Sequence, residues 1–139
     1  MRQNVFPEGL SRRVVSGKLL YSPVVSYDLG SHTLVFVSGL LARNAEGDIV
    51  GAGDMEAQIR QVGRNLEAAL SSVGATTRDL VRTATYVTQI EEFFRHVDAR
   101  HEFLGESLPT STTVEVKRLS HPDFMVEIEA VALMPSSLD

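Results

Sequence analysis

Cysteine is absent from this chain of 139 residues, so the chain has no disulfide framework and no thiolate nucleophile or metal ligand. An excess of positive charge is absent too. Thirteen basic side chains stand against eighteen acidic ones, and the net charge of −5 argues against a nucleic-acid partner. Long apolar runs are missing: residues 34–42 are too few to span a bilayer, and the N-terminus lacks the apolar core of a secretion signal. We therefore expect a cytoplasmic protein that binds neither nucleic acid nor membrane.

The composition that remains is that of an ordinary globular protein, with 43% hydrophobic and 22% charged residues. Charges of both signs are interspersed, and the sequence shows neither an internal repeat nor a linker. This organisation predicts a single domain over residues 1–139.

Strand patterns occur at both ends of the chain and in its middle. Residues 24–29 and 33–39 flank the turn Gly30-Ser31-His32, which predicts a hairpin, and the unbroken apolar run 34–37 predicts that its second strand is covered on both faces. Residues 80–88 alternate, with Val81, Thr83, Thr85 and Val87 on one face. Residues 112–118 and 124–134 flank the turn-forming residues 120–123, which predicts a terminal hairpin.

Two helices are expected between these strands. The first has an apolar stripe at three- and four-residue steps from Met55 to Val73, with Asp54 as its cap and Gly74 at its end. The second is predicted to begin at a capping box, Thr88 to Glu91, to bury Phe93, Phe94, Val97 and Leu104, and to end at Gly105. The order β-β-α-β-α-β-β predicts an α+β domain: a mixed sheet of five or six strands with both helices on one face and a second protein surface on the other.

Common catalytic motifs are absent: the sequence has no Walker loop, Rossmann glycine fingerprint, nucleophile elbow or His-Glu-x-x-His pair. The four histidines fall in turns or on the second predicted helix, and the spacing of His96 and His101 does not place them on one helical face. We predict neither a metal site nor a cofactor.

Glu127 and Glu129 are the residues with the clearest chemical potential. Two residues apart on a strand, they project to the same face among apolar neighbours. Half-burial raises the pKa of a carboxyl group and suits it to general acid-base work. The alternative is that one or both pair with Lys117, Arg118 or Arg82 on neighbouring strands.

Four segments in register resemble landmarks of the RidA (YjgF-type) reactive-intermediate deaminase family: Val35 to Gly39, Gly74 to Val81, Pro109 to Val116, and Val126 to Ala132. The resemblance runs from about Ser22 to Leu133. It implies a chorismate-mutase-like fold, a homotrimer whose sheets line a central core, and small-molecule clefts between subunits. Deaminase members of the family hydrolyse imines or enamines such as 2-aminoacrylate.

The resemblance also implies where the site lies and where this chain departs from the family. The position of the family's glutamate matches Glu127. The position of the arginine that holds the substrate carboxylate is occupied by Ser111, which supplies neither a charge nor a bidentate fork. The tyrosine common near the first strand is replaced by Val24 or Val25, with Tyr27 close by.

Other residues complete the expected site. Arg43, Arg100 or Arg118 is the candidate replacement for the missing arginine, and each is also explained as a solvated surface side chain. Ser38, Gly39, Arg100, Ser111 and Thr113 are the predicted substrate-binding residues, with Glu127 as the catalytic residue.

Three functions agree with these residues. The first is hydrolysis or deamination of a small imine, enamine or related nitrogen-containing metabolite at inter-subunit clefts. The second, motivated by Ser111, is a lyase or hydrolase of a catabolic pathway that lacks 2-imino-acid deaminase activity. The third is a trimeric small-molecule-binding protein without catalysis.

Overall fold

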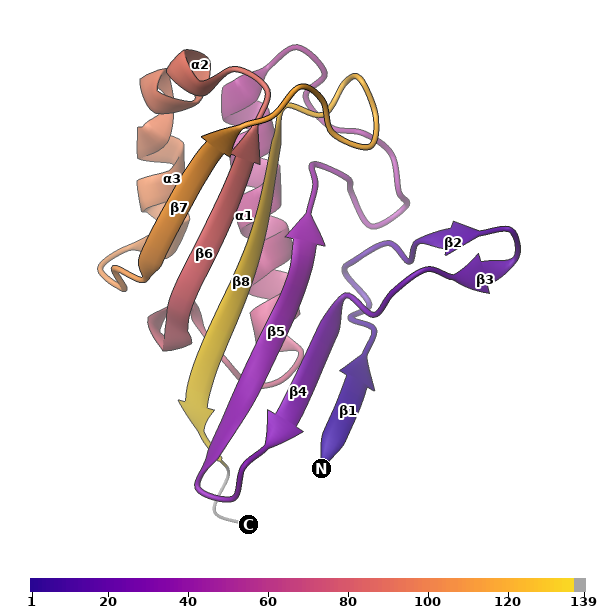
Figure 1. The fold of residues 1–139 in the computed structure, drawn as a ribbon, viewed down its shortest axis with the longest axis vertical. Coiled ribbons are helices and arrows are strands. Elements are labelled where there is room, and N and C mark those ends of the chain that lie inside the picture. The colour runs from indigo at the N-terminus through magenta and orange to yellow at the C-terminus, as the bar shows by residue number, and fades with distance from the viewer. Residues whose placement is uncertain (137–139) are drawn as a thin grey trace.

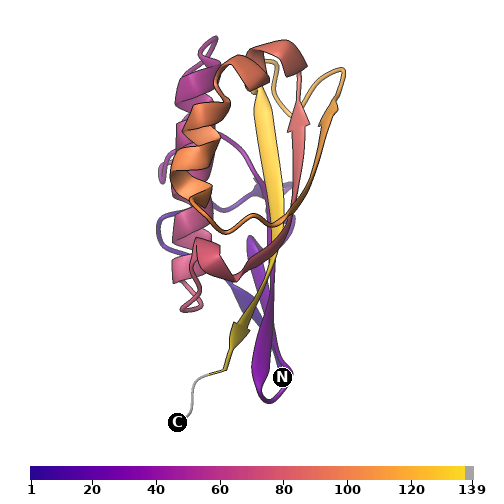
Figure 2. The same cartoon turned by 90° about the vertical axis from the view of Figure 1, so that its left-hand side faces the viewer.

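The computed structural model describes residues 1–136 and contains one main sheet with helices on a single face (Figures 1 and 2). The strand order is β1 (Arg2–Val5), β4 (Val24–Asp28), β5 (His32–Leu40), β8 (Val126–Pro135), β6 (Leu80–Val87) and β7 (Thr110–Glu115). The helical elements are α1 (Met55–Ser71), the 3-10 turn η1 (Thr77–Asp79), α2 (Ile90–Arg95) and α3 (Val97–Leu104). The predicted α+β class and one-sided helical layer are confirmed.

Helix α1 forms as its periodicity predicts. The Asp54 carboxylate accepts a hydrogen bond from the backbone N–H of Ala57, and the apolar stripe is buried against β5 and β8. The helix ends at Ser71, and Gly74, with φ of 81°, turns the chain away three residues later.

The second predicted helix differs from its expectation in three ways. It is interrupted at His96, which separates α2 from α3, and Phe94 on the outer side remains 53% exposed. The predicted capping box is wrong, because the N-cap residue is Gln89 and its side chain makes no capping hydrogen bond. The backbone N–H of Ile90 donates instead to the Glu115 carboxylate of β7. A side chain from a distant strand thus satisfies the helix terminus, which local sequence cannot reveal.

The hairpin of β4 and β5 is confirmed, and the terminal hairpin is wrong. β7 pairs with β6 in parallel at the edge of the sheet, whereas β8 lies between β5 and β6 and is antiparallel to both. The two strands differ in character: β8 alternates buried and half-buried residues, whereas β7 is largely exposed. An apolar strand gains more from a central position than a polar one does, which explains the arrangement.

Strand β6 shows a further departure. A register shift between Leu80 and Arg82 removes Val81 from the face it was expected to share, and its side chain is 45% exposed. Thr83, Thr85 and Val87 do lie together beneath the helices, as predicted. A β-bulge changes which face the residues before it occupy, and no periodicity within the strand signals it.

The sheet face opposite the helices is open within one chain (Figure 2). On this face Tyr27 and Leu133 are both paired with Leu34, and Phe36 lies two residues further along β5. Tyr27, Phe36 and Leu133 remain 46%, 45% and 39% exposed. The apolar run of β5 is therefore covered by the chain itself on one face, where Val35 and Val37 are buried.

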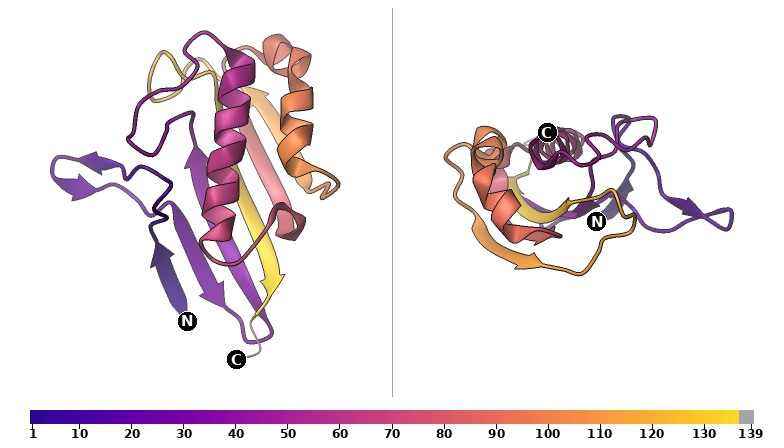
Figure 3. Two further views of the ribbon diagram at one scale, coloured as in Figure 1. Left: turned by 180° about the vertical axis from the view of Figure 1, so that it is seen from behind. Right: turned by 90° about the horizontal axis from the view of Figure 1, so that it is seen from above.

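A small two-stranded arm projects from the body of the molecule (Figures 1 and 3). It consists of β2 (Val14–Val15) and β3 (Lys18–Leu19), joined by Ser16 and Gly17 at φ of 52° and 75°. At its base the Leu20 N–H donates to the Arg13 carbonyl at 2.8 Å. Neither this arm nor β1 was predicted from the sequence.

The helices in the described part of the chain lack the length and apolar character needed to cross a membrane.

Candidate functional site

Glu127 projects from the start of β8, an inner strand of the sheet, on the face opposite the helices. On β8 it is paired with Tyr86 of β6, and Glu129 is paired with Ala84, so the two carboxylates share one face as predicted. The neighbouring residues Val126 and Ile128 are buried on the helix side, whereas Glu127 is half-buried. Strand alternation alone gives this orientation.

A β-bulge in β5 makes room for the Glu127 side chain. The register slips between Val37 and Leu40, so β5 has one more residue there than β8. Gly39 lies in this bulge. A Cβ at Gly39 would stand 2.8 Å from Cδ and 3.0 Å from Oε2 of Glu127, so the carboxyl group occupies the space that glycine leaves free.

The surroundings of Glu127 perturb its protonation. Burial raises the pKa of its carboxyl group, and the charge of Glu129 raises it further. Glu129 itself accepts a hydrogen bond from the Tyr86 hydroxyl. The predicted alternative, an ion pair of these glutamates with Lys117, Arg118 or Arg82, does not form within residues 1–136. Glu127 is therefore more readily protonated than an ordinary glutamate, and it has no hydrogen-bond or ion-pair partner among the described residues.

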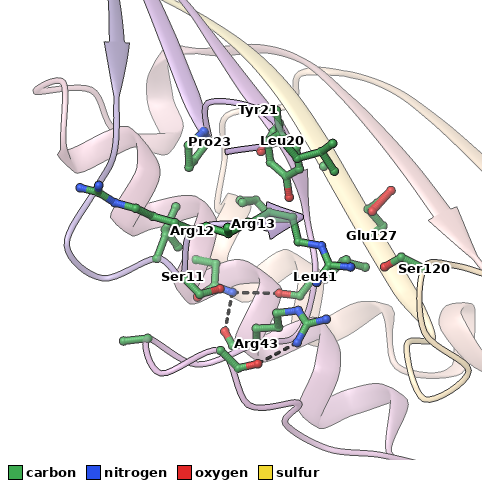
Figure 4. Close-up of a pocket in the computed structure, with 18 of the residues that line it drawn as sticks. Ser11, Arg12, Arg13, Leu20, Tyr21, Pro23, Leu41, Arg43, Ser120 and Glu127 are labelled. Carbon is green, nitrogen blue, oxygen red and sulfur yellow. Dashed lines mark hydrogen bonds between the residues drawn. The ribbon is translucent and has the colours of Figure 1, made fainter. Parts of the chain in front are cut away.

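A cavity of about 690 Å³ opens beside this carboxyl group (Figure 4). Its walls come from the base of the arm (within residues 10–14 and 20–23), the bulge (38–41), the loop after β5 (within 43–47), Asn65 of α1, Ser120 and Glu127. The volume falls in the range of sites for small organic ligands.

Helix α1 holds this region in place through two buried amides. Asn65 donates to the carbonyls of Leu41 and Arg43, both at 2.9 Å, and so fixes the loop that follows the bulge. Gln58, fully buried, donates to the Asp123 carbonyl at 2.7 Å and accepts from the Met125 N–H at 2.8 Å. The segment that leads into β8 and Glu127 is thereby tied to the helix.

Of the predicted site residues, Ser38, Gly39 and Glu127 meet at the cavity, and Arg43 lines it as well. The Arg43 guanidinium lies over the Phe124 ring at 4.8 Å and donates to the Gly47 carbonyl at 2.7 Å. These contacts fix Arg43 as part of the wall.

The remaining predicted residues lie elsewhere in the single chain. Arg100 of α3 donates to the Ser111 hydroxyl of β7 at 3.3 Å, and Thr113 follows on the same strand. None of these three lines the Glu127 cavity. Arg100 is half-buried, and this burial lowers the pKa of its guanidinium. Arg118 is exposed, and its Nε donates to the adjacent Leu119 carbonyl.

Most of the cavity wall was not predicted from the sequence, and its chemically important members are Arg13 and Tyr21. Tyr21 supplies an aromatic ring at the cavity, whereas Tyr27 lies on the open sheet face and does not line it. Burial raises the pKa of the Tyr21 hydroxyl, and the charge of Glu127 contributes in the same direction. The sequence does contain a pattern that indicates the arm carrying them: Ser16-Gly17 is a turn pair, and the short segments Val14-Val15 and Lys18-Leu19 flank it as the strands of a hairpin.

Fold and site together define a class: α+β proteins with one helical layer on a mixed sheet and a carboxyl-bearing cavity at a bulge in that sheet. The chain matches the family described as endoribonuclease L-PSP over residues 17–134. It belongs to this family, which includes the RidA (YjgF-type) proteins, and the resemblance seen in the sequence is confirmed.

Individual members of the family are similar to this chain over most of its length. A RutC family protein of Pyrococcus abyssi is 33% identical over 98 residues, which are 70% of this chain and 76% of the relative. A 2-iminobutanoate/2-iminopropanoate deaminase of Salmonella typhimurium is 35% identical, covering 79% and 85%. A 3-aminoacrylate deaminase RutC of Acinetobacter baylyi is 27% identical, covering 94% and 97%.

Solved structures agree with the fold. A YjgF-family protein of Mycobacterium tuberculosis is 33% identical with a TM-score of 0.71, covering 95% of this chain and 98% of that one. A Rid-family protein of Yersinia pestis is 26% identical with a TM-score of 0.80 and the same coverage.

Proposed function

We propose that this protein hydrolyses or deaminates a small imine, enamine or related nitrogen-containing metabolite, with Glu127 as the general acid-base. The observation that carries the proposal is a half-buried carboxyl group with a raised pKa and no ion-pair partner among the described residues, at the wall of a ligand-sized cavity. Relatives named as deaminases of 2-iminobutanoate and of 3-aminoacrylate support the reaction class.

The reaction needs a proton to be taken from one atom and given to another. In the proposed sequence Glu127 accepts a proton from a water molecule as the water oxygen adds to the imine carbon. It then returns this proton to nitrogen, which gives a carbinolamine. In the second step Glu127 takes the proton of the new hydroxyl group and gives it to the same nitrogen. The carbon–nitrogen bond then breaks, ammonia leaves, and the oxygen remains as the carbonyl group of the second product. A carboxyl group whose pKa is raised toward neutrality serves both steps better than an ordinary glutamate.

The proposal includes assembly as a homotrimer with its sites between subunits. Exposed Tyr27, Phe36 and Leu133 on the open sheet face support coverage by other copies of the chain. In that arrangement Arg100, Ser111 and Thr113 of one copy contribute substrate contacts beside the Glu127 cavity of its neighbour, and Ser38 and Gly39 contribute theirs from the bulge. Sedimentation velocity at several protein concentrations tests it, and a stable monomer would contradict it.

A specific comparison tests the catalytic role. Glu127→Gln keeps the shape of the side chain and removes its proton chemistry, whereas Glu129→Gln removes the same charge two residues away on the same face. Imino acids generated in the assay by an amino-acid oxidase are followed by ammonia release against a buffer blank. We expect Glu127→Gln to lower kcat by about 10²–10⁴-fold and Glu129→Gln to lower it by less than about tenfold. Equal rates for Glu127→Gln and the unmodified protein would refute the mechanism.

The serine at position 111 favours a second candidate, a lyase or hydrolase acting on a substrate without a carboxylate next to the reacting carbon. Under this alternative the unmodified protein does not accelerate release of ammonia from 2-imino acids. The same assay therefore separates the two functions.

A further inference from the structure

Positive side chains outnumber negative ones around the Glu127 cavity, whereas negative side chains are in excess in the whole protein. The chain carries a net charge of −5, yet the cavity wall has three arginines, Arg12, Arg13 and Arg43, and two glutamates, Glu46 and Glu127. A locally positive cavity on an acidic protein attracts anions to that place.

Two of these arginines already have aromatic partners. The Arg12 guanidinium lies over the Phe6 ring at 4.9 Å, and that of Arg43 lies over Phe124. Arg13 is different: within residues 1–136 its side chain makes neither an ion pair nor a hydrogen bond. Figure 4 shows its guanidinium extending across the cavity toward the side where Glu127 and Ser120 lie.

The backbone of Arg13 is nevertheless held in place. It immediately precedes β2, and its carbonyl accepts the Leu20 N–H at the base of the arm. Tyr21 follows Leu20 and is influenced by charges of both signs. The negative charge of Glu127 raises the pKa of its hydroxyl group, and the positive charges of Arg13 and Arg43 oppose that shift. The phenol thus lies near the carboxyl group and the guanidinium, which do not neutralise each other by an ion pair.

The same wall has an apolar side. Leu10 is buried, and Leu20 lines the cavity with 60% of its surface exposed, next to the Tyr21 ring. A guanidinium without a partner beside an exposed leucine and a tyrosine fits a ligand with one anionic end and an apolar remainder.

We propose that Arg13 binds the carboxylate of the ligand in this cavity, while the apolar remainder of the ligand lies on Leu10, Leu20 and Tyr21. The inference rests on the proposed function in taking the Glu127 cavity as the substrate site. It makes the substrate a carboxylate with an apolar side chain, and it assigns the anion to the arm rather than to Arg100.

Binding of a matched pair of small molecules tests this assignment without turnover. 2-Oxo-4-phenylbutanoate is the keto acid that hydrolysis of the corresponding imino acid would release, and 4-phenyl-2-butanone has a methyl group where the keto acid has its carboxylate. Calorimetry measures both with the unmodified protein and with Arg13→Gln, Arg13→Lys, Arg100→Gln and Arg78→Gln. Arg78 is exposed and outside the cavity, so its variant controls for the loss of one positive charge.

We expect Arg13→Gln to weaken keto-acid binding about tenfold or more, Arg13→Lys to weaken it less, and Arg78→Gln to leave it unchanged. Affinity for the neutral ketone should be equal in all of these proteins. The inference is overturned if Arg100→Gln weakens keto-acid binding while Arg13→Gln does not, or if the unmodified protein does not bind the keto acid. A dependence on Arg13 together with no imine hydrolysis would instead refute the proposed function and leave the anion site established.

Discussion

Gly39 offers a direct test of whether the bulge in β5 positions the catalytic carboxyl group. A methyl group there would stand 2.8 Å from Glu127 Cδ and 3.1 Å from its Cγ, closer than carbon atoms approach without repulsion. The backbone of Gly39 is not in the left-handed region, so Gly39→Ala introduces no backbone strain. The neighbour that must move is the end of a flexible side chain.

The expected cost is therefore small for stability and large for activity. Moving Glu127 to a poorer rotamer costs about 0.5–1.5 kcal/mol, which lowers Tm by roughly 2–6 °C in a domain of this size. Displacing a catalytic group by about 1 Å lowers the rate about 10²-fold. We expect Gly39→Ala to remain folded and to lose about 99% of kcat/KM for imine hydrolysis.

Two control variants test whether any loss of activity in Gly39→Ala comes from displacement of Glu127. Gly9→Ala adds a methyl group 3.6 Å from Ala68 Cβ, an ordinary contact, and should change neither quantity. In the Glu127→Gln background, Gly39→Ala should have little further effect on kcat/KM, since the group it displaces is already inactive. Full activity of Gly39→Ala, or an equal loss of activity in both backgrounds, would refute the reasoning.

Three further predictions concern pH and packing. If deprotonated Glu127 is the base, the acid limb of kcat/KM lies at higher pH than for an ordinary glutamate, and Glu129→Gln moves it toward lower pH; a limb that Glu129→Gln leaves unmoved contradicts this. Because the folded pKa of Glu127 exceeds the unfolded one, its contribution to stability is lost as pH rises through the folded pKa. Glu127→Gln should thus raise Tm at pH 8 more than at pH 4, and an equal change at both would disprove it. Gly63→Ala places a methyl group 2.3 Å from the Phe103 ring between α1 and α3, so we expect denaturant unfolding to show a loss of about 1–3 kcal/mol that Phe103→Leu partly restores.

Much of the fold follows from local patterns. The stripe from Met55 onward defines α1, the hairpin of β4 and β5 follows from its turn, and period-two alternation places Glu127 and Glu129 on one face. These features depend on residues a few positions apart, so the sequence alone was enough to predict them.

The arrangement of the last strands did not follow in that way. Polar and apolar patterns in β7 and β8 indicated two strands and a turn, but the same patterns allow a hairpin or separate partners. Strand pairing is decided by the total burial over the sheet, which involves residues far apart in the chain. For this reason the predicted hairpin was wrong even though both strands exist.

The candidate site shows the same division. By itself the sequence determined the face on which Glu127 lies, because the alternation of side chains along a strand is a local property. Only the tertiary structure decided that Arg13 and Tyr21, more than one hundred residues away in the chain, come to the same cavity, and that Arg100 contacts Ser111 elsewhere. The reason is physical: a sequence pattern encodes the face on which a side chain lies, whereas the surface it meets depends on how all the elements bury their apolar area together.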